Sequence, residues 1–298
     1  MIRRHTALLA LIAALSLVAL GCSSDDESTD SSTTTEATDG GGSGEEAAAC
    51  DPENPPTIED GTLTVATGEP AFEPWVVDDD PTNGEGYEAA VVYAVADQLG
   101  FAEEDVTWTR TGFDEAIAPG DKDYDFNVQQ YSITPERDEV VDFSESYYEV
   151  EQALVGAADG PLAGATSLAD LKDAKLGAAI GTTSLDYIET YIQPTTPPQV
   201  FDDNAAAKAA FDAGQVDGLV FDLPTAYYIT AVEIPDASII GVLPQEGDPE
   251  ELGFLFVEDS GLTGCVNAAL ATLREDGTLA ALEEQWLNQG GDIPTLEK

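Results

Sequence analysis

Imidazole is almost absent from this sequence, because its single histidine, His5, lies among the first residues. Catalytic triads that use histidine and metal sites ligated by histidine are therefore excluded from the rest of the chain. Only 10 residues are lysine or arginine, against 59 aspartates and glutamates, and the formal net charge is -49. Nucleic acids and anionic membrane surfaces attract clustered cations, so we expect neither as a partner.

The acidic excess runs along the chain and does not form a single tail. Two interpretations stay open, a field that steers cations and a solvated acidic coat suited to a salty environment. The acid-rich residues 78–84 resemble a calcium-binding loop, but no acid stands at its closing position. We therefore assign no metal and no cofactor.

Cysteine is scarce as well, with three residues in all. Cys22 follows two arginines and an apolar run at residues 7–20, which is typical of a secretion signal and too short to span a bilayer comfortably. Because Gly21 directly precedes Cys22, as in a bacterial lipoprotein, we expect residues 1–21 to be a signal peptide and Cys22 to be lipidated. The alternative is ordinary secretion without lipid.

Residues 22–49 contain no large apolar side chain, so burial cannot offset the entropy cost of ordering them. We predict a disordered tether between lipid and folded domain, and an extracytoplasmic, lipid-anchored protein. The other two cysteines, Cys50 and Cys265, are an even pair in an exported chain, which predicts a disulfide between them. Two separate thiols are the alternative.

Strand-like and helical patterns alternate beyond this point. We predict strands at residues 62–67, 106–111, 176–180 and 216–221, and a helix at residues 87–99. Apolar stripes at helical spacing in the C-terminal part are assigned to core packing and not to a ligand. This alternation predicts an α/β protein with largely parallel sheets.

The most informative segment is residues 131–137, YSITPER, directly after an apolar run at residues 124–128. It places the hydroxyl of Ser132 and the guanidinium of Arg137 five residues apart. A guanidinium held on a rigid turn is a natural bidentate partner for a carboxylate. In so acidic a chain, the alternative for Arg137 is a surface ion pair.

Together with five further segments, this motif resembles the family 3 solute-binding proteins of ABC transporters, amino-acid receptors with the type II periplasmic-binding fold. The resemblance covers residues 61–290 and implies two α/β lobes joined by two crossover strands. Lobe 1 would span residues 51–150 and 252–298, and lobe 2 residues 151–251. The crossovers would lie near residues 148–155 and 253–257. The further segments are GYE at 86–88, FSESYY at 143–148, GTT at 181–183, VDGLVFD at 216–222, and DGTL with EQW at 276–286.

A free amino acid is a zwitterion, and burying it requires a partner for each charge. Arg137 would bind the carboxylate, together with Thr182 and Thr183 at a helix N-terminus. Asp222, at a strand end, would bind the ammonium, although it could instead cap a helix. Ser132 could accept from the ammonium or donate to the carboxylate. The resemblance places Arg137, Ser132, Thr183 and Asp222 on the family's main-chain-recognition positions.

The resemblance also suggests residues for the side-chain pocket. Phe72 and Phe113 fall where the family places two rings against the ligand. Glu69 falls where an acid contacts cationic side chains, which favours a basic ligand unless Glu69 is simply solvated. Gln130 is included in the site, although it departs from the small residues usual there.

These features predict a monomeric binding protein that captures a free polar or charged amino acid and delivers it to an ABC transporter permease. One alternative is an enzyme on the same fold, of the cyclic-acid dehydratase type, with Asp222 and Glu69 as its carboxylate pair. The other is a sensor lipoprotein that signals to a partner.

Overall fold

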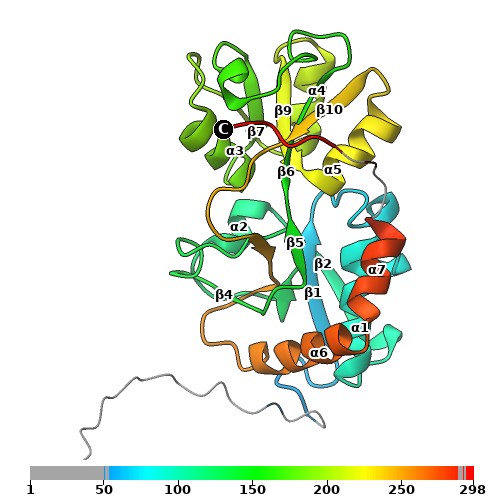
Figure 1. Ribbon diagram of the computed structural model, residues 1–298. Helices are drawn as coiled ribbons and strands as arrows, with labels where there is room; N and C mark the ends of the chain where they lie inside the picture. Colours follow the sequence, from blue (N-terminus) through cyan, green and yellow to red (C-terminus); the bar gives the residue numbers. More distant parts are fainter. Residues whose placement is uncertain (1–49, 51–53, 288–290, 292) are drawn as a thin grey trace, which may run out of the picture. The chain divides into compact units, whose positions relative to one another are not determined.

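The computed structural model describes Cys50, residues 54–287, Gly291 and residues 293–298 (Figure 1). The predicted signal peptide, tether and lipidation site Cys22 lie outside the described residues. Within the described ranges, no helix is long and apolar enough to cross a bilayer.

The first lobe is built on a five-stranded sheet with the order β2-β1-β3-β12-β4. β1 (Leu63–Gly68) runs parallel to β2 (Val106–Thr111) and to β3 (Phe126–Asn127). β12 (Leu255–Phe256) lies antiparallel between β3 and β4 (Asp142–Phe143). The predicted strands at 62–67 and 106–111 are confirmed, since their alternating apolar residues form these elements.

Among its described residues, this lobe contains the α-helices α1 (Tyr87–Gln98), α2 (Phe113–Ile117), α6 (Thr263–Glu275) and α7 (Thr278–Trp286). α1, α6 and α7 bury apolar side chains in the same core as β1. The predicted helix at 87–99 and the assignment of the C-terminal apolar stripes to packing are therefore confirmed. The described residues also include 3-10 turns at Val77–Asp79, Pro81–Asn83, Glu103–Asp105 and Leu168–Leu171.

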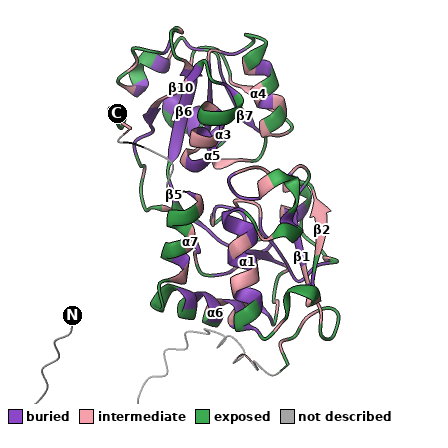
Figure 2. Cartoon of the chain, turned by 90° about the vertical axis from the view of Figure 1, so that its right-hand side faces the viewer, coloured by how far each residue is buried: buried purple, intermediate pink, exposed green. Residues whose placement is uncertain are grey.

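The second lobe is built on another five-stranded sheet, with the order β10-β6-β9-β7-β8. β6 and β7 are largely buried, whereas α4 buries Ala207 and Ala210 and exposes Ala205, Ala209 and Asp212 (Figure 2). The strands are β6 (Gln152–Ala157), β7 (Leu176–Ala179), β8 (Gln199–Phe201), β9 (Gly218–Asp222) and β10 (Ala237–Val242).

The helices of the second lobe are α3 (Thr183–Tyr187), α4 (Asn204–Asp212) and α5 (Leu223–Tyr228). α3 and α5 each continue into a π-helical turn, Ile188–Ile192 and Ile229–Glu233 respectively. Both sheets are thus flanked by helices, and the predicted two-lobed α/β fold is confirmed.

The prediction of largely parallel sheets is wrong, because both sheets are mixed. β7 is parallel to β8 and β9, but β6 is antiparallel to β9 and to β10. After crossing between the lobes, the chain enters one sheet as β6 and the other as β12. Each of these strands runs antiparallel to both of its neighbours. Periodicity reports that a segment is a strand but not which way it runs.

The two crossover strands pair with each other. β5 (Tyr148–Val150) and β11 (Glu250–Leu252) form an antiparallel two-stranded sheet in which Glu250 lies opposite Val150. Figure 1 shows β5 between the two sheets. The first crossover begins where it was predicted, but the second precedes the predicted residues 253–257, because its two glutamates hide the strand pattern.

The resemblance assigns the C-terminal residues to the first lobe, but the last described residues pack on the second sheet. The Leu296 N–H donates to the Val242 carbonyl at 2.8 Å. The Leu296 side chain is 3% exposed and packs in one core cluster with Leu243. The physical reason is that Leu296 is apolar and becomes buried in the core cluster of the second lobe.

The predicted disulfide between Cys50 and Cys265 is confirmed, and it joins residues 215 positions apart. Cys265 lies in the first turn of α6 and is 1% exposed. Because so long a loop is closed, replacing both cysteines with serine should lower the free energy of unfolding by about 2–5 kcal/mol. Urea denaturation would measure this loss, and the wild-type protein under reducing conditions should match the double variant. Equal stability of all three samples would contradict the prediction.

Candidate functional site

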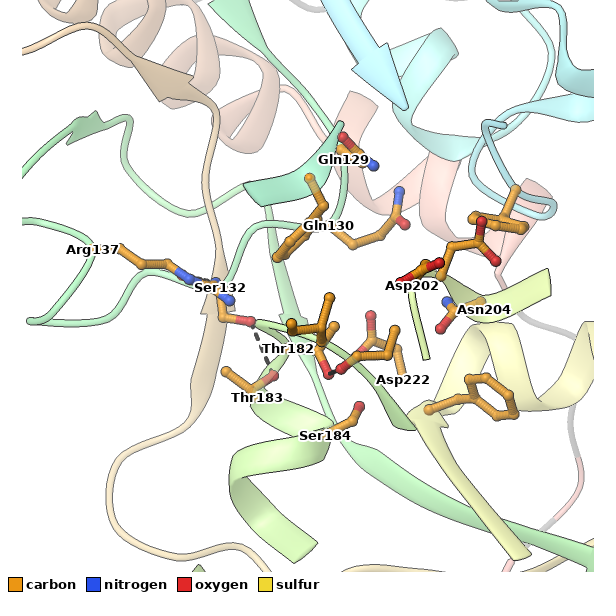
Figure 3. A pocket seen from close by; sticks show the side chains of 16 residues that line it. Gln129, Gln130, Ser132, Arg137, Thr182, Thr183, Ser184, Asp202, Asn204 and Asp222 are labelled. Atoms are coloured by element: carbon orange, nitrogen blue, oxygen red, sulfur yellow. Dashed lines mark hydrogen bonds between the residues drawn. The ribbon is translucent and has the colours of Figure 1, made fainter. Parts of the chain in front are cut away.

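One cavity is lined by residues of both lobes (Figure 3). Every predicted ligand contact except Glu69 lines it. The first lobe contributes Phe72, Phe113, Gln129, Gln130, Ser132 and Arg137, and the second lobe contributes Ala179, Ile180, Thr182, Thr183, Ser184, Asp202, Asp203, Asn204, Phe221 and Asp222.

The topology explains why these residues meet. Phe72 follows β1, and Ser132 follows β3, its parallel neighbour. In the second lobe Thr182 follows β7, and Asp222 ends the parallel strand β9. The carboxyl ends of parallel strands are where ligand clefts open in α/β sheets, and here two such edges contribute to one cavity.

The Arg137 side chain is buried and links the two lobes. Its Nη1 donates to the Ser132 carbonyl at 2.7 Å, and its Nη2 donates to the Gly181 carbonyl of the second lobe at 2.9 Å. Among the described residues it forms no salt bridge, so the surface ion pair is wrong. Burial lowers the pKa of its guanidinium, while the charge of Glu250 opposes that shift. Since a guanidinium carries five N–H donors, Arg137 can also bind a carboxylate in the cavity.

Gly181 meets Arg137 at a position that only glycine accommodates. Its φ is +70°, in the left-handed region, and a Cβ there would lie 2.3 Å from Oδ1 of Asp114 in the first lobe. A side chain at this position would be strained by the left-handed backbone and would push the Asp114 carboxylate aside.

Two predicted contacts share a carboxylate that the sequence analysis did not assign. Ser132 Oγ and Thr183 Oγ1 each donate to Glu250 Oε1, both at 2.6 Å. The two hydroxyl oxygens lie 3.4 Å apart (Figure 3). Glu250 on β11 thus connects the crossover to one hydroxyl from each lobe.

Asp222 belongs to the same network. Gln152 Nε2 donates to Asp222 Oδ1 at 2.7 Å and to Glu250 Oε2 at 3.1 Å, and Ser184 Oγ donates to Gln152 Oε1. Burial, followed by repulsion from Glu250, raises the pKa of Asp222 to about 7. Asp222 precedes α5 but makes no side-chain cap bond, so the interpretation as a helix cap is wrong.

Gln130 is held by a fully buried carboxylate, that of Glu88 on α1. The Gln130 backbone N–H donates to Glu88 Oε1 at 2.7 Å, and its side-chain amide donates to Glu88 Oε2. Tyr147 Oη donates to the same carboxylate. Burial raises the pKa of Glu88 to about 7, although these hydrogen bonds oppose the shift. The contacts fix Gln130, whose φ of +49° is uncommon outside glycine.

The two predicted rings line the cavity, and one of them supports Arg137. The guanidinium carbon of Arg137 lies 5.3 Å from the ring centre of Phe113, within range of a cation–π interaction. Phe113 in turn stacks on Tyr131 at 4.7 Å between ring centres. Phe72 reaches the cavity from the loop after β1.

Glu69 is exposed and does not line the cavity. The structure therefore does not bring it together with Asp222, and the proposed enzymatic pair of carboxylates is not assembled. Other acids stand closer to the ligand space, because Asp202 and Asp203 both line it. Asp203 also caps α4 by accepting from the Ala206 N–H at 2.7 Å.

Sequence reasoning missed the three residues that organise the site from outside the lining set. Glu88 belongs to the quoted GYE segment, but that motif gave no reason to expect its hydrogen bonds to Gln130. Gln152 begins β6 and Glu250 begins the crossover strand β11, where no motif marks them. Only the acid pair at residues 250–251, unusual in a strand, could have drawn attention to β11.

A sequence model of the bacterial extracellular solute-binding proteins, family 3, matches residues 63–289. The chain belongs to this family. The match includes every residue of the cavity and both crossover strands, so the resemblance seen in the short motifs extends through both lobes from residue 63 to residue 289.

Known relatives match this solute-binding protein over most of its chain and over most of their own. ABC transporter arginine-binding protein 1 of Escherichia coli K12 is 27% identical over 215 residues, covering 68% of this chain and 82% of the relative. The L-cystine-binding protein TcyJ of the same organism is 27% identical over 239 residues, covering 79% and 85%. An ancestral arginine-binding protein bound to arginine is 30% identical with a TM-score of 0.64, covering 76% and 98%.

The family and these relatives are binding proteins, not enzymes. Since the chain belongs to the family, and Glu69 lies away from Asp222, the enzymatic alternative loses its support. The geometry of the cavity, with a cation and several acids on opposing lobes, instead suits a small charged solute.

Proposed function

We propose that this protein captures a free polar or charged amino acid between its lobes and presents it to the permease of an ABC transporter. One observation carries the proposal: Arg137 of the first lobe and Asp222 of the second line a single cavity. An amino acid carries one carboxylate and one ammonium, and burying it requires a partner for each. Arg137 offers the carboxylate partner, and Asp222 the ammonium partner.

The remaining predicted contacts fit the same ligand. Thr182 and Thr183 border the cavity at the start of α3, and Ser132 and Gln130 border it from the first lobe. Phe72 and Phe113 offer ring faces to the ligand side chain. The similarity to amino-acid-binding proteins of transporters supports this reading. Lobe closure about β5 and β11 would enclose the ligand.

We further propose that the protein acts outside the cytoplasm as a monomer attached to the membrane through lipid on Cys22. The apolar run at residues 7–20 and Gly21 support this, and the family is extracellular. The permease would then receive the closed lobes at the membrane surface.

Thermal unfolding of the purified protein in the presence of each of the twenty amino acids, ornithine, citrulline and several amines tests the function. Ligand at a hundredfold excess over its Kd adds about 2.7 kcal/mol to the free energy of unfolding. This should raise Tm by about 5–10 °C. A shift with one or a few amino acids is the expected result. If no amino acid shifts Tm while the protein unfolds cooperatively, the proposed function is wrong.

A further inference from the structure

Glu250 is a charged residue of the site that neither the motifs nor the family comparison assigns. It lies on the crossover strand β11, partly buried, and its carboxylate contacts both lobes. Oε1 accepts from Ser132 Oγ of the first lobe and Thr183 Oγ1 of the second, and Oε2 accepts from Gln152 Nε2. Glu250 is therefore held by hydrogen bonds to three side chains and is not simply a solvated acid.

This arrangement fixes the polarity of two hydroxyls that border the ligand space. A hydroxyl has one proton to donate and two lone pairs that can accept. Ser132 and Thr183 each give their proton to Glu250, at 2.6 Å in both cases. Toward the cavity they can therefore only accept, and the ligand group that meets them must be an N–H or O–H donor.

The charges around the cavity also favour a positively charged donor group on the ligand. Arg137 is the cation among the lining residues, whereas Asp202, Asp203 and Asp222 are acids. Glu250 adds a further carboxylate in contact with the lining hydroxyls. A ligand with a net positive charge balances this set better than a neutral zwitterion, and an anionic side chain would be repelled.

We propose that Glu250 is a specificity-determining residue: it holds the Ser132 and Thr183 hydroxyls as acceptors, so that the site selects the ligand's amino group and takes cationic L-amino acids. The inference rests on the proposed function and adds to it the class of substrate and a residue that selects it. Glu250 acts through the two hydroxyls and need not touch the ligand itself.

The test compares ligands with and without the α-amino group. Kd is measured by calorimetry for L-arginine and for 5-guanidinopentanoic acid, which is arginine without that group, on the wild-type protein and on Glu250→Gln. Both hydroxyls donate to Oε1, and Gln152 donates to Oε2. A glutamine that keeps its carbonyl toward Gln152 therefore turns its NH2 group toward both hydroxyls, which frees their protons to face the cavity. The ratio of the two Kd values, deaminated over amino, should therefore fall about tenfold in the variant.

The ratio separates this role from a structural one. If Glu250 only favoured lobe closure, its loss would weaken both ligands by the same factor and leave the ratio unchanged. The matched control is Glu251→Gln, which removes the same charge one residue along β11, from an exposed side chain. Neighbouring strand residues point to opposite faces, so this variant should keep the wild-type ratio.

Three results would overturn the inference. The ratio could stay within twofold of the wild-type value in Glu250→Gln, or Glu251→Gln could lower it equally. The wild-type protein could also bind L-glutamine or L-glutamate as tightly as L-arginine, which would contradict the cationic class. Each of these leaves the proposed function standing, because that function fails only if no amino acid shifts Tm.

Discussion

Arg137→Ala should weaken binding of the amino-acid ligand by at least about a hundredfold, because it leaves a buried carboxylate without its partner. Arg137 is only 7% exposed, so little water could replace the lost donors. The variant also loses the bond from Arg137 Nη2 to the Gly181 carbonyl, which spans the lobes at 2.9 Å. Calorimetric titration of wild-type and variant protein with the ligand found in the thermal screen would measure the loss.

Two further variants make this test specific. Arg137→Lys keeps the positive charge but lacks the planar fork, so it should recover only part of the affinity. Arg274→Ala removes a partly exposed cation on α6 that pairs with Glu145, and it should bind like the wild type. Unchanged affinity in Arg137→Ala, with a cooperative unfolding transition, would remove Arg137 from the site.

Asp222→Asn should weaken binding of the amino acid at least tenfold, and more than binding of its deaminated analogue, because the lost charge faces the ammonium. Calorimetry on both ligands measures the two losses. Equal losses for both ligands would show that Asp222 has a structural role instead.

The pH dependence gives a second measure of Asp222. Burial raises its pKa to about 7 in the free protein, and the ligand's ammonium needs its charged form. Wild-type affinity should therefore fall as pH drops below about 7, by up to about tenfold per pH unit. Asp222→Asn should flatten this profile. A wild-type affinity that is constant between pH 5 and pH 8 would contradict the assignment.

The stability of the free protein should change in the opposite sense. The folded-state pKa values of Asp222 and Glu88, both about 7, lie above their ordinary values of 3.8 and 4.5. The folded state therefore binds more protons than the unfolded state between about pH 4 and pH 7, and these groups stabilise it most at the acidic end. Their contribution is lost as pH rises toward 7. Asp222→Asn should remove the part of this pH-dependent stability that comes from Asp222 and leave the part that comes from Glu88.

The short motifs led to eight residues that line one cavity, because each motif is local in sequence. Ser132 and Arg137 are five residues apart, and the Arg137 Nη1 to Ser132 carbonyl bond forms within that one turn. Thr182 precedes α3 and Asp222 ends β9, as their flanking patterns indicated. The order of the motifs along the chain was then enough to predict that both lobes contribute to one site, and residues of both lobes line one cavity.

Glu69 shows the limit of reasoning by position. Its position relative to Phe72 matches that of an acid in the resembled family. The loop after β1 nevertheless leaves Glu69 exposed, while Phe72 lines the cavity. The direction of a loop side chain depends on backbone turns that residue spacing does not encode. The negative charge at the cavity comes instead from the second lobe and from β11.

The sequence by itself determined four of the strands, helix α1, the disulfide partners, the exclusion of histidine chemistry and half of the cavity lining, because each depends on composition, periodicity or a short motif. Tertiary structure alone decided the mixed strand directions, the C-terminal contact with the second lobe, and the place of Glu250. The bonds of Glu250 to Ser132 and Thr183 join residues 118 and 67 positions apart. No local pattern records such contacts, since they arise only when the crossover strand carries one side chain to a hydroxyl of each lobe.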